Sequence, residues 1–308
     1  MTIQRWTIPS GEAGRAEWLA RRRNYINGSE IGGLFGCSPF LTAYALYMDK
    51  ARLIEPEDKD NKAMRRGRWQ EPAVAEMIRD LHPEWQIEKC ADYFYSNELG
   101  LGCTPDYWVT CPERGRGILQ CKNVARRIFE NEWGEELPLW IILQTLLEQM
   151  LTEVPWGLTG VMVRTEFDDE PKEFPFERHP EAEQRIIDAT AEFWASVKAG
   201  RRPKPDYAAD ADIIRAVYAR DTGKTVDLSR DNRMGELLDI RERLSAEKTG
   251  AEKELKAITA EIAEKMGDAT YAIVPGWDKV SFKTQMRKGY VVEDTTFRVL
   301  RAKRAQAR

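Results

Sequence analysis

The residues best suited to chemistry lie in the middle of the chain, on two candidate strands joined by a turn. Asp106 begins the first strand, and Gln120, Cys121 and Lys122 follow on the next, after thirteen intervening residues. Alternate residues of a strand share a face, so Gln120 and Lys122 point together, whereas Leu119 and Cys121 point into a core. Pairing of the strands would bring Asp106 beside them. An aspartate oxygen, a second side-chain oxygen and a strand carbonyl suit Mg²⁺, and the lysine could orient a water or stabilise a phosphoryl group.

These residues also have a purely structural explanation. Proline and aspartate, here Pro105 and Asp106, are common in turns, and Lys122 could be an ordinary surface lysine. The spacing alone therefore leaves a metal-dependent phosphodiester chemistry and a simple strand–turn–strand unit both open.

The sequence has few residues for catalysis by histidine or cysteine. The only histidines, His82 and His179, each precede a proline, which disfavours a histidine metal site and a Ser/His/Asp triad. The five cysteines contain no C-x-x-C pair, which argues against a zinc ribbon and a disulfide scaffold and fits a reducing cytoplasm; they are Cys37, Cys90, Cys103, Cys111 and Cys121. A hydrolase of this composition must use carboxylates and lysine.

Length and composition indicate a globular protein of about two domains. The 308 residues are 42% hydrophobic, and no run of 18 apolar residues or signal-peptide pattern is present, so we expect no membrane association. The net charge of −4 conceals an asymmetry, because residues 279–308 carry nine basic and two acidic side chains. This basic end favours a polyanionic partner.

The hydrophobic pattern predicts the elements that would position the chemistry. Residues 1–90 are mostly helical, with an apolar helical pattern that begins at Glu71. The next region alternates in an α/β order, with strands at 92–95, 107–110, 118–122 and 158–164 and helices at 138–151 and 180–198. We place a domain boundary between 203 and 204. Residues 204–308 should form a long helix, or a helical hairpin broken near Gly250, followed by a β-hairpin and the basic end.

Several phrases occur in a fixed order around this core. They are Trp18-Leu-Ala-Arg-Arg22, Gly28-Ser-Glu-Ile-Gly-Gly-Leu-Phe-Gly-Cys-Ser-Pro-Phe40, Arg66-Gly-Arg-Trp-Gln-Glu71, Thr104-Pro-Asp106, Gln120-Cys-Lys122, Gln144 and Leu158-Thr-Gly-Val-Met-Val163. Together they resemble the λ-exonuclease/YqaJ-type phage recombinase nucleases of the PD-(D/E)xK superfamily. The resemblance covers roughly residues 15–200, and Lys279-Val-Ser-Phe-Lys-Thr-Gln285 resembles the C-terminal ends of longer phage members.

The resemblance implies both a fold and an activity. The fold is α/β, a restriction-endonuclease-like core with a central mixed sheet flanked by helices, here followed by a helical arm and hairpin. The activity is that of a Mg²⁺-dependent exonuclease, with two ions that Mn²⁺ could replace. It would degrade double-stranded DNA ends 5′ to 3′ and leave 3′ overhangs for a single-strand annealing protein. A ring, with a trimer as the first expectation, and the cytoplasm of a phage- or prophage-bearing bacterium are also implied.

The resemblance also assigns roles to individual residues. Glu71 and Asp106 would be metal-binding carboxylates, the carbonyl of Cys121 a further ligand and Lys122 the motif lysine. Gln120 falls where the family has an acidic ligand, so it would contribute an oxygen but no charge. The residues matching the family's 5′-phosphate pocket are Arg22, Ser29, Thr104 and Gln144, a set that joins one guanidinium fork to neutral donors.

Gln120 leaves the activity open. It is either an engineered substitution that inactivates the enzyme or a natural variation. An endonuclease of the same fold and a catalytically inactive DNA-end-binding protein therefore stay as alternatives. Structural explanations also remain for individual residues: Glu71 could be a first-turn glutamate that the helix dipole stabilises, and Ser29 a helix N-cap.

Overall fold

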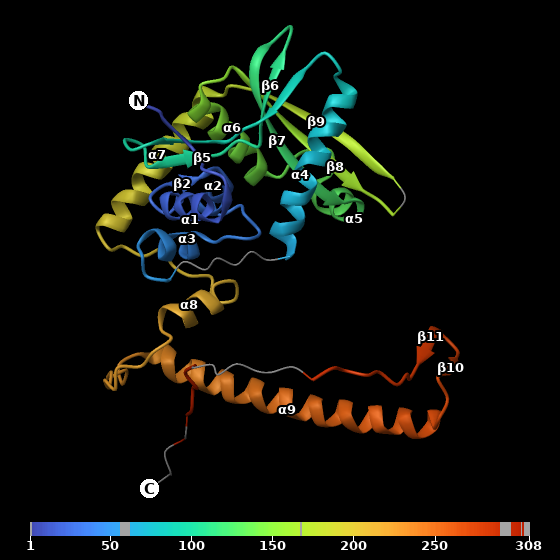
Figure 1. Cartoon of the computed structure of the whole chain (residues 1–308). Helices are drawn as coiled ribbons and strands as arrows, with labels where there is room; N and C mark the ends of the chain where they lie inside the picture. The colour runs from blue at the N-terminus through green and yellow to red at the C-terminus, as the bar shows by residue number, and fades with distance from the viewer. Residues whose placement is uncertain (1, 56–61, 167, 290–296, 303, 305–308) are drawn as a thin grey trace. The chain divides into compact units, whose positions relative to one another are not determined.

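The computed structural model describes residues 2–55, 62–166, 168–289, 297–302 and 304 (Figure 1). Parts of the basic C-terminus lie outside the described residues. The chain forms two compact units, Met1–Val217 and Tyr218–Arg308, which we describe separately.

A five-stranded mixed sheet forms the centre of the first unit. Its spatial order is β3 (Gln86–Lys89), β6 (Tyr107–Cys111), β7 (Gly115–Ala125), β8 (Trp156–Arg164) and β9 (Asp169–Glu177). β7 and β8 pair in parallel, and the other neighbours are antiparallel. The sequence pattern did not reveal β9, which contains Pro171 and Pro175; prolines are tolerated because β9 is an edge strand.

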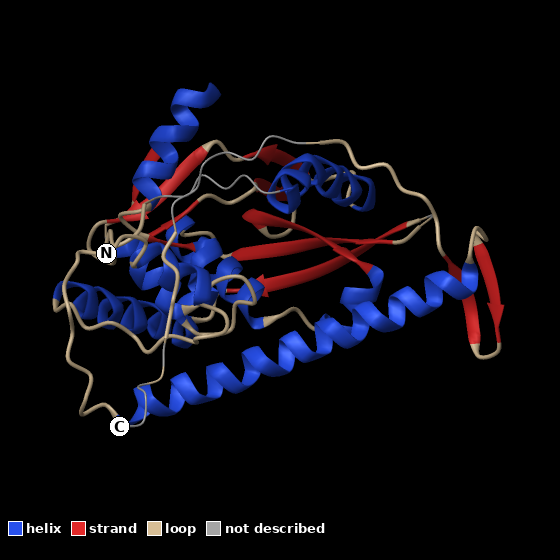
Figure 2. Cartoon of the chain, turned by 90° about the horizontal axis from the view of Figure 1, so that it is seen from below, coloured by secondary structure: helices blue, strands red, loops and turns tan. Residues whose placement is uncertain are grey.

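Helices cover both faces of this sheet, as predicted (Figure 2). On one face, Ile78 of α4 (Lys62–Leu81) packs in a cluster with Leu119 of β7. On the other face, Thr145 of α6 (Leu139–Thr152) exchanges a 2.9 Å hydrogen bond with Thr159 of β8, the register partner of Gln120. The alternation along β7 therefore directs Leu119 and Cys121 toward α4, and Gln120 and Lys122 toward α6.

The start of α4 corrects one interpretation of Glu71. The helix begins at Lys62, so Glu71 lies in its middle and is not a first-turn glutamate. The next residue, Pro72, has no N–H to donate within the helix, which explains why the sequence suggested a helix start at this point.

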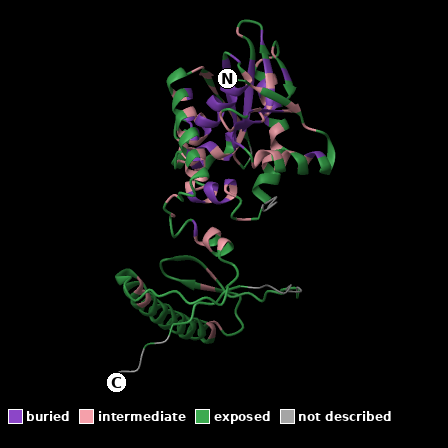
Figure 3. Ribbon diagram, turned by 90° about the vertical axis from the view of Figure 1, so that its left-hand side faces the viewer, coloured by how far each residue is buried: buried purple, intermediate pink, exposed green. Residues whose placement is uncertain are grey.

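A second sheet and most of the remaining helices complete the first unit. The sheet has the order β1 (Gln4–Thr7), β4 (Asp92–Ser96), β5 (Leu101–Cys103) and β2 (Ile26–Asn27), and only β4 was predicted. The helices are α1 (Gly11–Arg22), η1 (Gly28–Glu30), α2 (Ile31–Leu34), α3 (Ala43–Lys50), α5 (Arg126–Ile128), η2 (Phe129–Trp133) and α7 (Pro180–Lys198). Buried residues of β2, β4, β5, α2, α3, α6 and α7 form one large apolar cluster (Figure 3), whereas α5 and η2 pack against a smaller one.

The first unit continues past residue 203. Asp210 is 1% exposed and accepts a hydrogen bond from Thr42 at the start of α3. It leads into α8 (Ala211–Val217), whose Ile213 and Ile214 pack against the large apolar cluster. These contacts place α8 with the first unit.

The second unit is built on one long helix. α9 (Asn232–Met266) is continuous through Gly250, and its N-cap Asp231 accepts a hydrogen bond from the Met234 amide at 3.1 Å. The predicted hairpin is present as β10 (Tyr271–Val274) and β11 (Trp277–Ser281). All of α9 is described, and none of its residues is buried.

None of the helices in the described part of the chain has the length and apolar character needed to cross a membrane.

Candidate active site

The carboxylate of Asp106 meets β7 at the position that the sequence predicts. The antiparallel register pairs Tyr107 with Leu119, so Asp106 lies beside the next residue of β7. Asp106 Oδ2 accepts hydrogen bonds from Gln120 Nε2 at 2.6 Å and from the Cys121 amide at 2.8 Å. The N–H and C=O of a strand residue point to the same side, so the Cys121 carbonyl also lies on the Asp106 side.

Lys122 faces α6 and contacts two of its residues, Gln144 and Trp140. Its Nζ donates to Gln144 Oε1 at 2.9 Å and lies 5.6 Å from the centre of the Trp140 ring. Gln144 Nε2 in turn donates to Glu148 Oε1 at 2.9 Å. Both ends of the Gln144 amide are therefore occupied in this arrangement, with the oxygen toward the lysine and the nitrogen toward the carboxyl.

Three of the four residues predicted to bind a 5′-phosphate, namely Arg22, Ser29 and Thr104, gather around Trp18, whereas Gln144 lies beside Lys122. Arg22 lies 4.5 Å from the centre of the Trp18 ring and donates to Ser29 Oγ at 2.8 Å. The indole Nε1 of Trp18 donates to Thr104 Oγ1 at 3.2 Å, which leaves the threonine hydroxyl hydrogen for another acceptor. A guanidinium and two hydroxyls thus share one partly exposed surface.

Gly28 brings Arg22, Ser29 and Thr104 (the phosphate-type residues) close to Lys122 and Gln144. A Cβ atom at residue 28 would lie 3.1 Å from Glu148 Oε1 and 3.3 Å from Gln144 Cγ, so a larger residue would push these side chains away by a few tenths of an ångström. Ser29 follows Gly28 directly, and Thr104 is two residues before Asp106. The predicted residues therefore form one continuous polar cluster, with the Asp106 and Arg22 groups on either side of Lys122 and Gln144.

Glu71 joins the cluster from α4 through a lysine that the sequence analysis did not single out. Glu71 Oε2 forms a 2.8 Å ion pair with Lys89 Nζ on β3, and the same Nζ lies 4.6 Å from the Tyr107 ring centre. Burial tends to lower the pKa of Lys89, but the hydrogen bond to Glu71 and the charge of Asp106 outweigh it and raise the pKa. Lys89 thus neutralises part of the negative charge here.

Two carboxyl groups of the cluster hold protons more tightly than usual. Burial and the neighbouring charge of Glu71 raise the pKa of Asp106 to about 6. Burial and the charge of Asp106 raise the pKa of Glu148 to about 8, although Lys122 and Arg22 oppose the shift. Clustering of such groups is typical of functional sites.

The oxygen atoms around Asp106 suit a divalent cation. Gln120 is 3% exposed, and its Oε1 has no hydrogen-bond partner among the described residues, so this oxygen is free to act as a ligand. With Asp106, Glu71 and the Cys121 carbonyl it supplies the oxygen donors that Mg²⁺ prefers. Over the same residues, no three His, Cys, Asp or Glu side chains group as metal ligands, and position 120 adds no acidic one. The set fits one ion better than two.

Sequence reasoning missed Trp18 as a contact of the phosphate-type residues, and also Lys89 and Glu148. Trp18 was visible as part of the Trp18–Arg22 phrase, one helical turn before Arg22. Glu148 follows Gln144 by four residues inside an apolar helix, a spacing that places two polar groups on one face. Lys89 gave no signal, because its position opposite Tyr107 depends on the pairing of β3 with β6.

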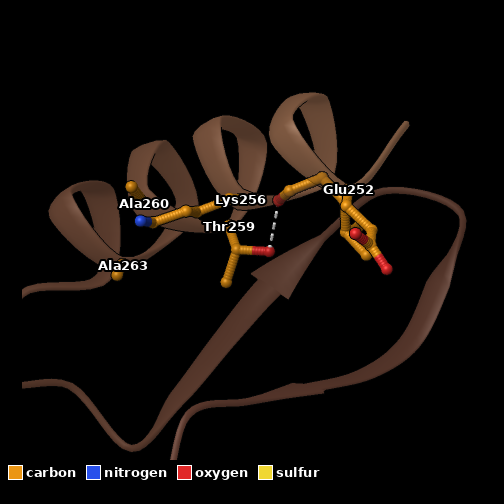
Figure 4. Close-up of a pocket in the computed structure, with 6 residues that line it drawn as sticks. Glu252, Lys256, Thr259, Ala260 and Ala263 are labelled. Carbon is orange, nitrogen blue, oxygen red and sulfur yellow. Dashed lines mark hydrogen bonds between the residues drawn. The ribbon is translucent and has the colours of Figure 1, made fainter. Parts of the chain in front are cut away.

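No comparable cluster occurs on α9. The shallow groove along this helix is lined by Glu252, Leu255, Lys256, Thr259, Ala260 and Ala263 (Figure 4). Its Thr259 hydroxyl donates to the Leu255 carbonyl within the helix. The lining thus offers isolated charges and small side chains, and the candidate chemistry belongs to the first unit.

Comparison with known proteins agrees with the resemblance that the sequence motifs indicate. Residues 17–154 match the YqaJ-like viral recombinase domain. The chain is 24% identical over 275 residues to "Uncharacterized protein YqaJ" of Bacillus subtilis (strain 168), which covers 86% of this chain and 82% of that protein. It also resembles two solved structures. The alkaline exonuclease LHK-Exo from Laribacter hongkongensis has a TM-score of 0.48 and 17% identity, over 65% of this chain and 98% of that one. A phage related exonuclease from Haemophilus somnus 129PT has a TM-score of 0.41 and 12% identity, over 57% and 96%.

The match to the YqaJ-like viral recombinase domain covers residues 17–154, in agreement with the resemblance that the sequence motifs carry. Every predicted site residue, from Arg22 to Gln144, lies within this range.

Proposed function

We propose that this protein is a metal-dependent exonuclease that degrades one strand of double-stranded DNA from its 5′ end in phage-type homologous recombination. The observation that carries the proposal is the joining of two groups in one cluster: Asp106, Gln120 and Lys122 on one side, and Arg22 and Ser29 on the other. The first group suits phosphodiester hydrolysis and the second suits a terminal phosphate. The match to a viral recombinase domain supports DNA as the substrate.

The phosphate-type residues would fix the position of the cut. A terminal 5′-phosphate would accept hydrogen bonds from the Arg22 fork, the Ser29 hydroxyl and the Thr104 hydroxyl. Stacking of Arg22 on Trp18 orients the guanidinium before DNA arrives, which lowers the entropy that binding must overcome. Gln144, whose amide is engaged by Lys122 and Glu148, would contribute only if its amide turns toward the phosphate.

Lys122 would act at the bond that breaks. Attack of water on phosphorus breaks the bond to the 3′ oxygen and places negative charge on the phosphoryl oxygens, which an ammonium group stabilises. Gln144 holds Lys122 Nζ at 2.9 Å, so the charge is positioned before the reaction. Asp106, when ionised, would accept a hydrogen bond from the attacking water or bind the cation.

A bound Mg²⁺ or Mn²⁺ would supply Lewis-acid activation of water and stabilisation of the leaving oxygen. Asp106, Glu71, Gln120 Oε1 and the Cys121 carbonyl would hold the first ion. A second ion needs the charge that a glutamate at 120 would provide. Gln120 now donates to Asp106, so it both lacks that charge and occupies the carboxylate.

The remaining parts of the proposal are those that the resemblance to phage recombinase nucleases implies. The product would carry 3′ overhangs, on which a single-strand annealing protein loads. We also propose a homo-oligomeric ring, with a trimer as the first expectation, in the cytoplasm of the bacterial host. The arm formed by α9 and the hairpin would hold DNA or a partner protein.

The test follows strand loss from linear duplexes that carry a 5′-phosphate or a 5′-hydroxyl, in Mg²⁺, with the parent chain and Gln120→Glu compared. We expect Gln120→Glu to degrade the phosphorylated strand at least about a hundredfold faster than the parent, since one ligand charge is restored. Lys122→Ala in the Gln120→Glu background is the control and should be inactive. Covalently closed circles should stay intact, and their cleavage would show an endonuclease.

A second candidate function is binding of DNA ends without cleavage. The hydrogen bond from Gln120 to Asp106 favours it, because this bond satisfies the carboxylate without a cation. Tight end binding in Ca²⁺ or Mg²⁺, with no strand loss even after Gln120→Glu, would establish this function and reject the exonuclease.

A further inference from the structure

α6 carries a buried carboxyl group that the proposed mechanism does not use. Glu148 is 1% exposed and lies one turn after Gln144. Its Oε1 accepts the Gln144 Nε2 hydrogen bond at 2.9 Å. The backbone of Gly28 closes the other side, since a Cβ atom there would be 3.1 Å from this oxygen. Oε1 is therefore held between η1 and α6.

The direction of the Gln144 amide depends on its two partners. The donor and acceptor ends of an amide exchange by a half-turn of the side chain, so the hydrogen-bond network decides which end faces which neighbour. Lys122 Nζ can only donate, and it requires the amide oxygen. Glu148 Oε1 accepts, and it requires the amide nitrogen. The two requirements agree on one orientation.

We infer that Glu148 is a positioning residue, which fixes the Gln144 amide and through it holds the Lys122 ammonium at the phosphate to be cleaved. The inference rests on the proposed function, which gives Lys122 its role. Burial raises the pKa of Glu148 to about 8, and its Oε2 has no partner among the described residues. Oε2 can therefore carry the proton while Oε1 remains an acceptor, so the orientation does not depend on the charge of the carboxyl.

Two substitutions separate the acceptor from the bulk of the side chain. Glu148→Leu removes the acceptor with little change in volume, so the buried Gln144 amide nitrogen loses its partner and the amide can turn its donors toward Lys122. Glu148→Gln keeps an acceptor oxygen at the same place. Thr145→Val is the matched control, because it removes another buried side-chain hydrogen bond of α6, the 2.9 Å bond to Thr159.

The kinetic measurement uses the Gln120→Glu background and a 5′-phosphorylated duplex. We expect Glu148→Leu to lower kcat by about ten- to a hundredfold, with KM for DNA ends within about threefold. Glu148→Gln should restore kcat to within about threefold, and Thr145→Val should leave kcat unchanged even where it lowers Tm. A fall in kcat with Thr145→Val equal to that with Glu148→Leu would overturn the inference, since loss of packing would then explain both.

A second measurement does not need an active nuclease. Reductive methylation of Lys122, followed by mass spectrometry of its peptide at fixed pH, reports how firmly the ammonium is held. In the parent chain, Glu148→Leu should accelerate labelling several-fold, whereas Glu148→Gln and Thr145→Val should not. Equal rates in all four proteins would overturn the inference. If Gln120→Glu does not cut DNA but labelling changes as expected, the proposed function fails while the positioning of Lys122 by Glu148 stands.

Discussion

Two helices with apolar residues at helical spacing, α6 and α9, differ sharply in burial. Ten of the fourteen residues of α6 are buried, whereas none of the thirty-five residues of α9 is (Figure 3). On α6, Gln144 and Glu148 have fixed partners across three elements. On α9, charges pair mainly with neighbours on the same helix, as Arg243 does with Glu247 at 2.7 Å.

The difference shows what burial adds to a polar residue. A solvent-exposed ion pair on one helix contributes little and is easily exchanged for water. A buried polar group cannot exchange its partner for water, so its orientation is fixed and its pKa shifts. Chemistry therefore concentrates where an apolar helix carries a few polar residues, whereas the charges of α9 remain exchangeable with water.

The largest expected effect on stability comes from truncating a leucine of α6, and the same change on α9 is its comparison. Leu147 of α6 is 0% exposed, and Leu147→Ala should lower the free energy of unfolding of the first unit by about 2–5 kcal/mol through lost burial and a cavity. Leu255 of α9 is 66% exposed, and Leu255→Ala should change stability by less than about 0.5 kcal/mol. Denaturant titrations should follow tryptophan fluorescence for the first unit and circular dichroism for the helices.

The contrast between α6 and α9 fails if Leu147→Ala and Leu255→Ala lower the free energy of unfolding equally. A loss of more than about 1 kcal/mol for Leu255→Ala, with a dependence on protein concentration, would mean that α9 is buried against a second chain in solution. The two units should be fitted as separate transitions, because a chain with two compact units need not unfold in one step.

The fold was predictable from the sequence where burial is regular. The apolar runs of β8 and α6, the strand–turn–strand of β6 and β7 and the C-terminal hairpin appear as predicted, and α9 is the unbroken helix of the two predicted alternatives. β9 was not predictable, since prolines and charges conceal its alternation and only an edge position tolerates them. The short strands β1, β2 and β5 depend on partners distant in sequence, which no local pattern encodes.

The candidate site was predictable to the extent that one strand determines it. Asp106, Gln120 and Lys122 come together because of a local turn and a two-residue repeat. A glutamine in an apolar helix suggests that Gln144 has a polar partner in the folded protein. The sequence does not predict which way its amide group points. Lys89 and Glu148 act through approaches between elements far apart in the chain, and these require the folded structure.

The next prediction compares carboxyl groups on the two helices by their effect on stability at different pH. The folded-state pKa of Glu148 is raised to about 8 from 4.5, so between these values the unfolded chain releases a proton that the folded chain keeps. Stability of the parent should therefore fall as pH rises through this window, which is the sense expected for a raised carboxyl pKa. Glu148→Gln does not titrate, so its Tm should gain a few degrees over the parent by pH 9.

The matched control lies on α9. Glu247→Gln changes a carboxylate whose side chain is 57% exposed, and it should leave the dependence of Tm on pH as it is in the parent. The measurement is a thermal melt from pH 5 to pH 9 for the three proteins. A gap between the parent and Glu148→Gln that stays constant over this range would contradict a raised pKa for the buried carboxyl.

The smallest expected effect is a gain in stability on α9. Gly250 lies in the interior of this helix, and a Cβ atom there would meet nothing within 4 Å. Gly250→Ala should therefore stabilise α9 by about 0.5–1 kcal/mol, because alanine loses less backbone freedom in a helix. In the first unit the same change at Gly117 should be destabilising, since a Cβ atom would approach the Trp156 ring to 2.5 Å. Circular dichroism during denaturation measures both. If Gly250→Ala loses stability, α9 is either broken at this glycine in solution or covered there by a second chain, and its exposure would no longer distinguish it from α6.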